Sequence, residues 1–206
     1  MNIRESGVLR RAQPADRGDI RRWRNHPQVR AASFTGHEIS ANEHEKWFER
    51  VLADPTRELL IYSDDGVPAG VVLFERVRAE AGERTASWGF YLDLAGLEER
   101  GTGLSAWLGV QRAALDHAFD TLDLDVLTGE VLEHNTVVRR ANRRFGFVEG
   151  PPAERVVDGR TVAYREITLR RADRRGAARP VPGGGTAGTS SDATRTGTAQ
   201  TSEEPA

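Results

Sequence analysis

The sequence feature that most restricts the fold is the glycine-flanked loop Gly101-Thr102-Gly103. It follows an aromatic stretch and comes directly before an apolar one. Glycine lets backbone N–H groups approach an anion without a Cβ in the way, and the positive end of a helix dipole would lie at the same point. The pattern therefore indicates a phosphate-binding loop, to which Arg100 could add a cation. The loop is not a Walker A motif, because no Lys-Ser or Lys-Thr follows it, and it lacks the third glycine of a dinucleotide fingerprint. Glycine at a helix start can also serve turn geometry alone, and this interpretation stays open beside the first.

The segments around this loop predict a mixed α/β sheet. Apolar periodicity and turn signals mark the expected elements. Strands are expected at residues 8–12, 59–63, 70–76, 85–93, 125–132, 147–148 and 161–169, helices at 16–25, from 40 onward, at 104–119 and at 135–145, and a loop at 97–103. In this order a long antiparallel meander is followed by one β-α-β crossover.

Local signals mark several helix ends. The residue before a proline is pushed out of the helical region, so His26-Pro27 should end the first helix. Ser40 to Glu43 fits a capping box at the start of the second helix. Asn135 is typical of a helix N-cap, and Gly146 of the position just past a helix end.

The polar residues of the chain gather at its end. From residue 172 to residue 206 the sequence has no aromatic residue, and Val181 is its only large aliphatic one. Such a segment cannot bury enough apolar surface to offset the entropy lost on ordering. We therefore expect one folded domain at residues 1–171 and a disordered polar tail at residues 172–206.

Composition excludes several classes of protein. The 206 residues include 29 Lys+Arg and 31 Asp+Glu, with a formal net charge of −2, so we expect neither a nucleic acid nor a membrane as partner. No apolar run is long enough to span a membrane, and the N-terminus lacks the apolar core of a signal peptide. Cysteine is absent, which excludes disulfides and fits a cytoplasmic location. The histidines show no ligand spacing, so no metal site is expected.

Two further motifs accompany the loop. The stretch Glu98-Glu99-Arg100-Gly101-Thr102-Gly103 is followed by Asn135 and then by Phe145-Gly146-Phe147. With the order of elements, these motifs resemble the GNAT superfamily of N-acetyltransferases, which are acyltransferases that use acetyl-CoA. The family's loop reads Gln/Arg-x-x-Gly-x-Gly/Ala, from which Glu98 departs. The resemblance covers nearly all of residues 1–171, and it implies a single α/β domain whose mixed, mostly antiparallel sheet is splayed between the fourth and fifth strands, with helices on both faces.

A second set of short motifs, in one order, resembles a single subgroup. They are Trp23-Arg24-Asn25, Val29-Arg30, Ile39-Ser40, His44, Trp47-Phe48, Trp88-Gly89-Phe90-Tyr91, Glu130-Val131-Leu132 and residues 145–150. The subgroup is the acetyltransferase of the pseudaminic acid pathway, which acetylates the 4-amino group of a UDP-linked dideoxy amino sugar, and the resemblance implies an acceptor of this kind. Protein N-termini such as those of ribosomal proteins, small antibiotic amines and a catalytically idle coenzyme-binding module stay open as alternatives.

The resemblance implies that acetyl-CoA binds between the splayed strands. Backbone groups near Phe90, Tyr91 and Leu92 would hold the pantetheine arm and polarise the thioester carbonyl. The other expected coenzyme contacts are Arg100, Gly101, Thr102, Gly103, Leu104, Ser105, Asn135 and Asn142. Phe90 and Leu92 can be core residues as well, because binding would use the backbone and packing the side chains.

Two residues are expected to act in catalysis. Glu130 lies late in the strand that faces the splay, where a partly buried carboxylate could accept the proton of the amine. An ordinary surface glutamate is the alternative. Many relatives carry a tyrosine four residues before the closing glycine as the general acid, but this chain has Asn142 there. Tyr91 is the nearest tyrosine that could replace it, unless the thiolate leaves without an acid.

Arg24, Asn25, His44 and Trp47 are expected to bind the acceptor. Arginine can donate two hydrogen bonds to a diphosphate, and an aromatic ring can pack on a sugar or base. His44 lies in the first turn of its helix, where the dipole disfavours an imidazolium, so we expect it to be neutral. Arg24 could instead be a surface arginine, and His44 could pack on Trp47. The resemblance implies a small-molecule amine as partner and leaves a homodimer open.

Overall fold

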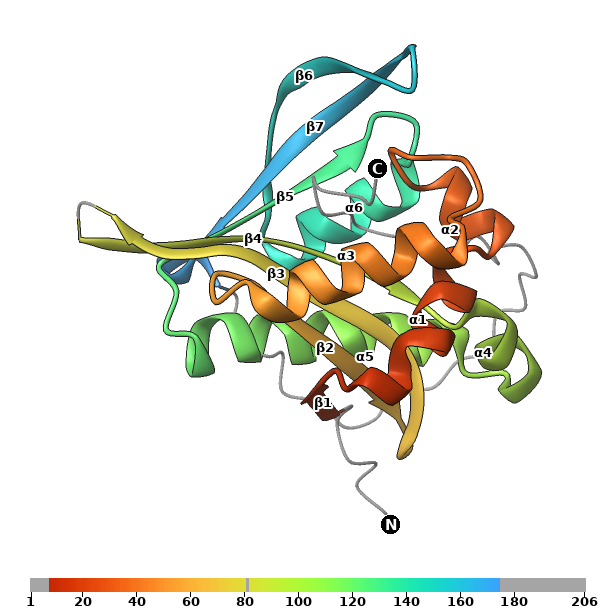
Figure 1. Cartoon of the computed structure of the whole chain (residues 1–206). Helices are drawn as coiled ribbons and strands as arrows, with labels where there is room; N and C mark the ends of the chain where they lie inside the picture. The colour runs from red at the N-terminus through yellow and green to blue at the C-terminus, as the bar shows by residue number, and fades with distance from the viewer. Residues whose placement is uncertain (1–7, 81, 175–206) are drawn as a thin grey trace, which may run out of the picture.

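The computed structural model describes residues 8–80 and 82–174. Within these residues seven strands form one sheet in the order β1-β2-β3-β4-β5-β7-β6 (Figure 1). The strands are β1 Val8–Arg11, β2 Glu58–Asp64, β3 Val67–Glu80, β4 Glu83–Leu92, β5 Val126–Leu132, β6 Val148–Val157 and β7 Arg160–Arg170. The α-helices are α1 Arg17–Arg24, α2 Pro27–Ala31, α3 Ala41–Ala53, α4 Leu94–Arg100, α5 Gly103–Asp116 and α6 Thr136–Phe145. Three short helical turns are η1 Pro14–Asp16, η2 His117–Thr121 and η3 Arg171–Asp173.

The pairing of the strands confirms the predicted fold class. Neighbouring strands run antiparallel from β1 to β4, and β5, β7 and β6 are also antiparallel to one another. The pair β4–β5 is parallel, and α4 and α5 connect its two strands. The chain is therefore a single α/β domain with a mixed, mostly antiparallel sheet and one β-α-β crossover.

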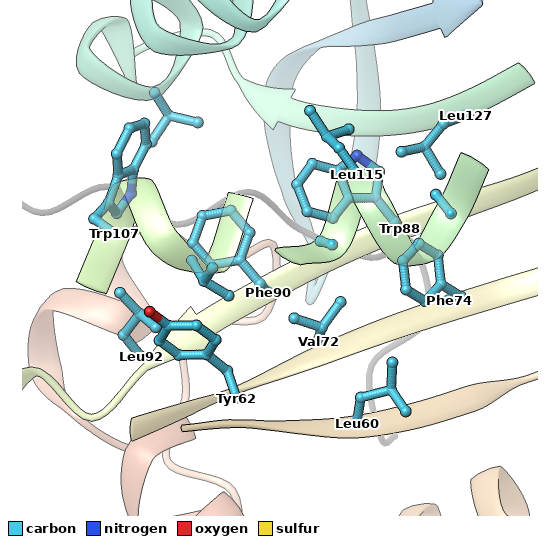
Figure 2. Packing of buried hydrophobic residues seen from close by; sticks show 14 of the residues in the cluster. Leu60, Tyr62, Val72, Phe74, Trp88, Phe90, Leu92, Trp107, Leu115 and Leu127 are labelled. Atoms are coloured by element: carbon cyan, nitrogen blue, oxygen red, sulfur yellow. The ribbon is translucent and has the colours of Figure 1, made fainter. Parts of the chain in front are cut away.

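Helices cover both faces of the sheet, because successive strand residues point to opposite sides. On β3, Val71 and Leu73 pack with residues of α1 and α3, whereas Val72 and Phe74 pack with residues of α5. Figure 1 shows α1 and α3 in front of the sheet and α5 behind it. Figure 2 shows side chains of the α5 side pointing toward one another from the sheet and the helix. Each face of the sheet thus has its own apolar core.

Three predicted helix ends are confirmed. Ser40 caps α3 by accepting a hydrogen bond from the backbone N–H of Glu43, whose carboxylate accepts one from the N–H of Ser40. The Asn135 side chain accepts a bond from the N–H of Val138 at the start of α6. Gly146 ends that helix with a φ of 98°, a left-handed conformation that favours glycine.

The strands β4 and β5 separate along their length. They pair at Thr85–Val126, Ala86–Leu127 and Ser87–Thr128, and the described residues show no pairing beyond Ser87. Beyond that point β4 stays paired with β3, and β5 stays paired with β7. Figure 1 shows β4 leading toward α4 while β5 follows β7 away from it. The expected splay between the fourth and fifth strands is therefore present.

Two helices were missed by the sequence prediction. Residues 97–103 were predicted to form a loop, but most of this stretch belongs to α4, which ends at Arg100. Asp93 begins α4 by accepting a hydrogen bond from the N–H of Gly96 at 3.2 Å. Pro27 does follow the end of α1, as predicted, but it also begins α2, because proline suits the first position of a helix.

The C-terminal strand β6 is longer than predicted, and ordered contacts extend a little past residue 171. β6 extends to Val157 through Pro151 and Pro152, which an edge strand tolerates because one side of it needs no ladder bonds. Ordered contacts continue past the predicted boundary at residue 171. The guanidinium of Arg174 contacts carboxylate oxygens of Asp116 at 2.5 Å and Asp120 at 2.7 Å. The rest of the predicted tail, from residue 175 on, lies outside the described residues.

Among the described residues, none of the helices is both long and apolar enough to cross a membrane.

Candidate active site

The start of α5 is open on the side where the glycine-flanked loop was identified. Gly101 has a φ of 66° and ends α4. Thr102 precedes α5 without capping it, and its buried Oγ1 has no hydrogen-bond partner among the described residues. A Cβ placed on Gly103 would meet no described atom within 4 Å. The first N–H groups of α5 have no acceptor within the helix, so an anion could bind there.

The gap between β4 and β5 is bordered by backbone groups of β4. A Cβ on Gly129 of β5 would lie 3.2 Å from the carbonyl oxygen of Trp88, so that carbonyl points toward β5. A Cβ on Gly70 of β3 would lie 2.7 Å from the carbonyl oxygen of Tyr91, which therefore points the other way. By alternation, the N–H and C=O groups of Phe90 and Leu92 face the gap.

These observations fit the predicted coenzyme contacts in part. An extended pantetheine arm could pair with the groups of Phe90 and Leu92 that β5 leaves without a strand partner, and a pyrophosphate could bind at the start of α5. The backbone of Tyr91 is used in pairing with Val71 of β3, so its contribution would come from its half-buried side chain. Around the loop, Arg100, Leu104 and Ser105 are exposed and accessible to a ligand.

Asn142 lies on α6, where many relatives carry a tyrosine. Its side chain is fully buried, and neither its Oδ1 nor its Nδ2 has a hydrogen-bond partner in the described part of the chain. Buried amides are normally hydrogen-bonded, so this group is suited to a polar ligand or a water molecule. Asn135, in contrast, uses its side chain to cap the same helix.

Glu130 lies on β5, two residues beyond the last pair with β4. Its neighbours Leu127 and Val131 belong to the α5-side core, so alternation places Glu130 on the opposite face, toward α1 and α3. The residue is buried, with 9 % of its surface exposed. Its Oε1 accepts a hydrogen bond from the guanidinium of Arg155, and its buried Oε2 has no partner within the described ranges. Oε2 is therefore a vacant acceptor beside the splay.

His44 is a neutral histidine on the same side of the sheet. It is buried in α3, with its ring 5.2 Å from that of Trp47 and 6.2 Å from that of Phe48. Burial lowers the pKa of His44 to about 4, and the positive charges of three arginines of α1, Arg21, Arg17 and Arg24, act in the same direction. The expected neutral state thus follows mainly from desolvation rather than from the helix dipole.

Arg24 and Asn25 hold the segment at residues 32–39 in place. The buried guanidinium of Arg24 donates a hydrogen bond to the carbonyl of Thr35 at 3.0 Å. The Asn25 amide donates to the carbonyl of Ile39 at 2.9 Å, and its oxygen accepts from the Ile39 N–H at 2.8 Å. Trp47 packs in the core between α3 and the sheet and exposes no stacking face. In the described structure, the predicted acceptor residues therefore serve mainly to hold the backbone and the core on this side of the molecule.

The sequence prediction missed two residues near Glu130. Arg155 comes from β6, and no local pattern links it to a glutamate on β5. Glu75 lies on β3 in register with Ser87, the last residue of β4 that pairs with β5. Burial raises the pKa of Glu75, and Arg57 lies 3.5 Å from its Oε1. A charged residue inside an apolar strand run was the signal that could have identified Glu75.

The diverging strands β4 and β5 and the open start of α5 fit the acetyltransferase class that the resemblance implies. The chain belongs to the GNAT acetyltransferase family, because the family model described as an acetyltransferase (GNAT) domain matches residues 8–148. The prediction of an N-acetyltransferase with acetyl-CoA as acetyl donor is confirmed at this level.

Solved structures show the same fold. The spermidine N-acetyltransferase of Vibrio cholerae, in complex with CoA and spermine, superposes with a TM-score of 0.67 at 19 % identity, over 82 % of this chain and 97 % of that one. The putative acetyltransferase yncA of Salmonella typhimurium, with acetyl-CoA, has a TM-score of 0.57 at 19 % identity, over 86 % and 99 %. No curated protein sequence matches the chain. None of these matches supports the amino-sugar subgroup, so the acceptor stays a proposal.

Proposed function

We propose that the chain transfers the acetyl group of acetyl-CoA to a primary amine of a small molecule, with Glu130 as the proton acceptor. The observation that carries the proposal is the position of Glu130: a buried carboxylate with a vacant Oε2, two residues past the point where β4 and β5 separate. When bound, acetyl-CoA would supply an acetyl group activated as a thioester. Its expected position in the gap brings that group close to the vacant oxygen.

The candidate residues would have different roles in binding and in proton transfer, according to their positions. The N–H groups at Gly103 and the start of α5 would hold the pyrophosphate, and the backbone of Phe90 and Leu92 would align the arm. Glu130 Oε2 would accept the proton that the amine loses, directly or through a water molecule. The Asn142 amide could donate a hydrogen bond to the sulfur, since it cannot act as an acid.

We further propose that the acceptor carries negative charge, as a UDP-linked dideoxy amino sugar does through its diphosphate, and that its 4-amino group receives the acetyl group. The charges of Arg21 and Arg24, together with that of Arg17, which is paired with Glu45, create a positive potential around His44. Such a potential favours a diphosphate and disfavours a polycation. Arg24 is bonded to Thr35, so Arg21, which is half-buried, is the better placed cation.

A polyamine is the second candidate acceptor, since the V. cholerae structure is that of a spermidine N-acetyltransferase. The two candidates are separated by measuring thiol release from acetyl-CoA with a UDP-4-amino sugar, spermidine and an N-terminal peptide. The proposal predicts turnover of the sugar nucleotide and inhibition by UDP. Preferred turnover of spermidine would overturn the acceptor assignment, and no thiol release with any amine would indicate a catalytically idle module.

A variant sharpens the same comparison. Arg21→Ala should raise the acceptor KM by about ten-fold, as expected for a lost charge-assisted contact, while the KM for acetyl-CoA changes little. Arg22→Ala is the matched control, because Arg22 is exposed and paired with Asp19 on the same helix. Equal effects of Arg21→Ala and Arg22→Ala would remove the support for an anionic acceptor.

A further inference from the structure

The guanidinium of Arg155 lies over two aromatic rings. Its central carbon lies 4.6 Å from the ring centre of Phe34 and 4.3 Å from that of Tyr164. The two rings meet edge to face, with their centres 5.5 Å apart. Phe34 comes from the segment between α2 and α3, and Tyr164 from β7. The arginine is therefore fixed by elements that are far apart in the sequence.

This fixed arginine donates a hydrogen bond to one oxygen of Glu130. The side chains are 28 % exposed for Arg155 and 11 % for Glu130, so water competes weakly for the contact. Burial opposes the charge of Arg155, but its contacts with Tyr164 and Glu130 raise the pKa of the guanidinium above its ordinary value. The guanidinium therefore stays charged at physiological pH, and it contacts Oε1 of Glu130 alone.

Two other acidic groups face Glu130. Glu166 is its cross-strand partner on β7. Glu75 on β3 is close enough for the charge of Glu130 to contribute to its raised pKa. Glu130 therefore lies near two further carboxylates, and a cation beside it offsets the repulsion between their charges. Arg155 is the cation that the described residues place in direct contact with Glu130.

We propose that Arg155 is a positioning residue for acetyl transfer: it occupies Oε1 of Glu130, and so presents Oε2 as the single proton-accepting oxygen toward the splay. The inference rests on the proposed role of Glu130. It also assigns a function to Phe34, which braces the arginine from the segment that Arg24 and Asn25 hold in place. The contact of Phe34 with Tyr164 of β7 and with Arg155 of β6 thus helps to set the orientation of the carboxylate.

The test compares Arg155→Met, Arg155→Lys and Glu130→Gln in the full chain. Arg155→Met should lower kcat about ten-fold or more and move the acid limb of the kcat/KM profile to higher pH, because a cation that favoured the carboxylate is lost. The KM for acetyl-CoA should not change. Arg155→Lys should restore the pH profile but only part of kcat, since it returns the charge without the planar guanidinium.

Two controls make the result decisive. Arg165→Met removes a comparable arginine of β7 that binds Glu133 instead, and it should leave both kcat and the pH profile unchanged. In the Glu130→Gln background, Arg155→Met should cause no further loss. If Glu130→Gln is inactive but Arg155→Met behaves like Arg165→Met, the inference is overturned while the proposed function stands. If Glu130→Gln keeps full activity, the proposed role of Glu130 fails first.

Phe34→Leu provides a milder variant if Arg155→Met does not fold. It is expected to change kcat in the same direction, by lowering it.

Discussion

At the scale of single residues, some side chains around the splay are proposed to act in the reaction, and others hold the surrounding backbone and core in place. Glu130 could be proposed from the sequence, because alternation in one strand is enough to place it on a face. Arg155 could not, since its contact with Glu130 depends on how β6 and β7 return beside β5. Trp47 and Arg24 were expected to bind the acceptor, but burial and backbone bonding account for both in the described structure.

His44 predicts a pH dependence of stability. Its pKa is lowered from an ordinary 6.5 to about 4, so the unfolded chain takes up a proton at higher pH than the folded one. The free energy of unfolding should therefore fall as the pH drops from about 6.5 toward 4, by up to roughly 3 kcal/mol. His44→Gln should remove this loss, as measured by urea unfolding at a series of pH values.

The exposed His134 supplies the control for this experiment. His134→Gln should keep the pH dependence of the parent chain. Parallel curves for the parent chain and His44→Gln would mean that His44 isn't the titrating group.

At the scale of elements, the helix ends were the best predicted features, because capping depends on neighbours three or four residues away. Ser40, Asn135 and Gly146 all act as expected. α4 was missed because two glycines suggested a loop, and only Gly101 needs a left-handed φ. The splay itself followed from the family resemblance, since no residue in β4 or β5 marks where two strands stop pairing.

The open start of α5 predicts the effect of a side chain on Gly103. The space there is empty of described atoms, so Gly103→Val should fold. The added methyl groups would fill the anion site, and coenzyme A affinity should fall about ten-fold or more, the equivalent of a lost charge-assisted contact. Calorimetry with coenzyme A measures this affinity.

Gly18→Val, on the exposed side of α1, is a control with similar free space. Unchanged affinity in folded Gly103→Val would exclude this loop as the coenzyme site.

At the scale of the whole molecule, the sequence predicted the fold class and the order of most elements along the chain, and ordered contacts reach Arg174, a little past the expected boundary at residue 171. The expected boundary at residue 171 was based on where apolar residues become rare. Composition does not reveal an ion pair, and Arg174 contacts the domain through ion pairs with Asp116 and Asp120. Phe119, 5.7 Å from this guanidinium, adds a cation–π contact.

Two truncations test the revised boundary. A chain ending at Arg174 should melt like the full chain and keep its acetyl transfer, whereas one ending at Arg171 should lose about 1 kcal/mol with the ion pairs of Arg174. Thermal unfolding compares them. A large loss of stability already at Arg174 would show that the omitted residues contribute to the fold.

The measurement that tests the central claim most directly is the acetyl-transfer rate of Glu130→Gln. The substitution keeps the size and the hydrogen bond to Arg155 but removes the basic oxygen. With the acceptor that the parent chain turns over, kcat/KM should fall by about 10²-fold or more, as expected for a lost general base. Calorimetric affinity for coenzyme A and the melting temperature should stay close to those of the parent chain. A folded Glu130→Gln that turns over the acceptor within two-fold of the parent rate would contradict the account.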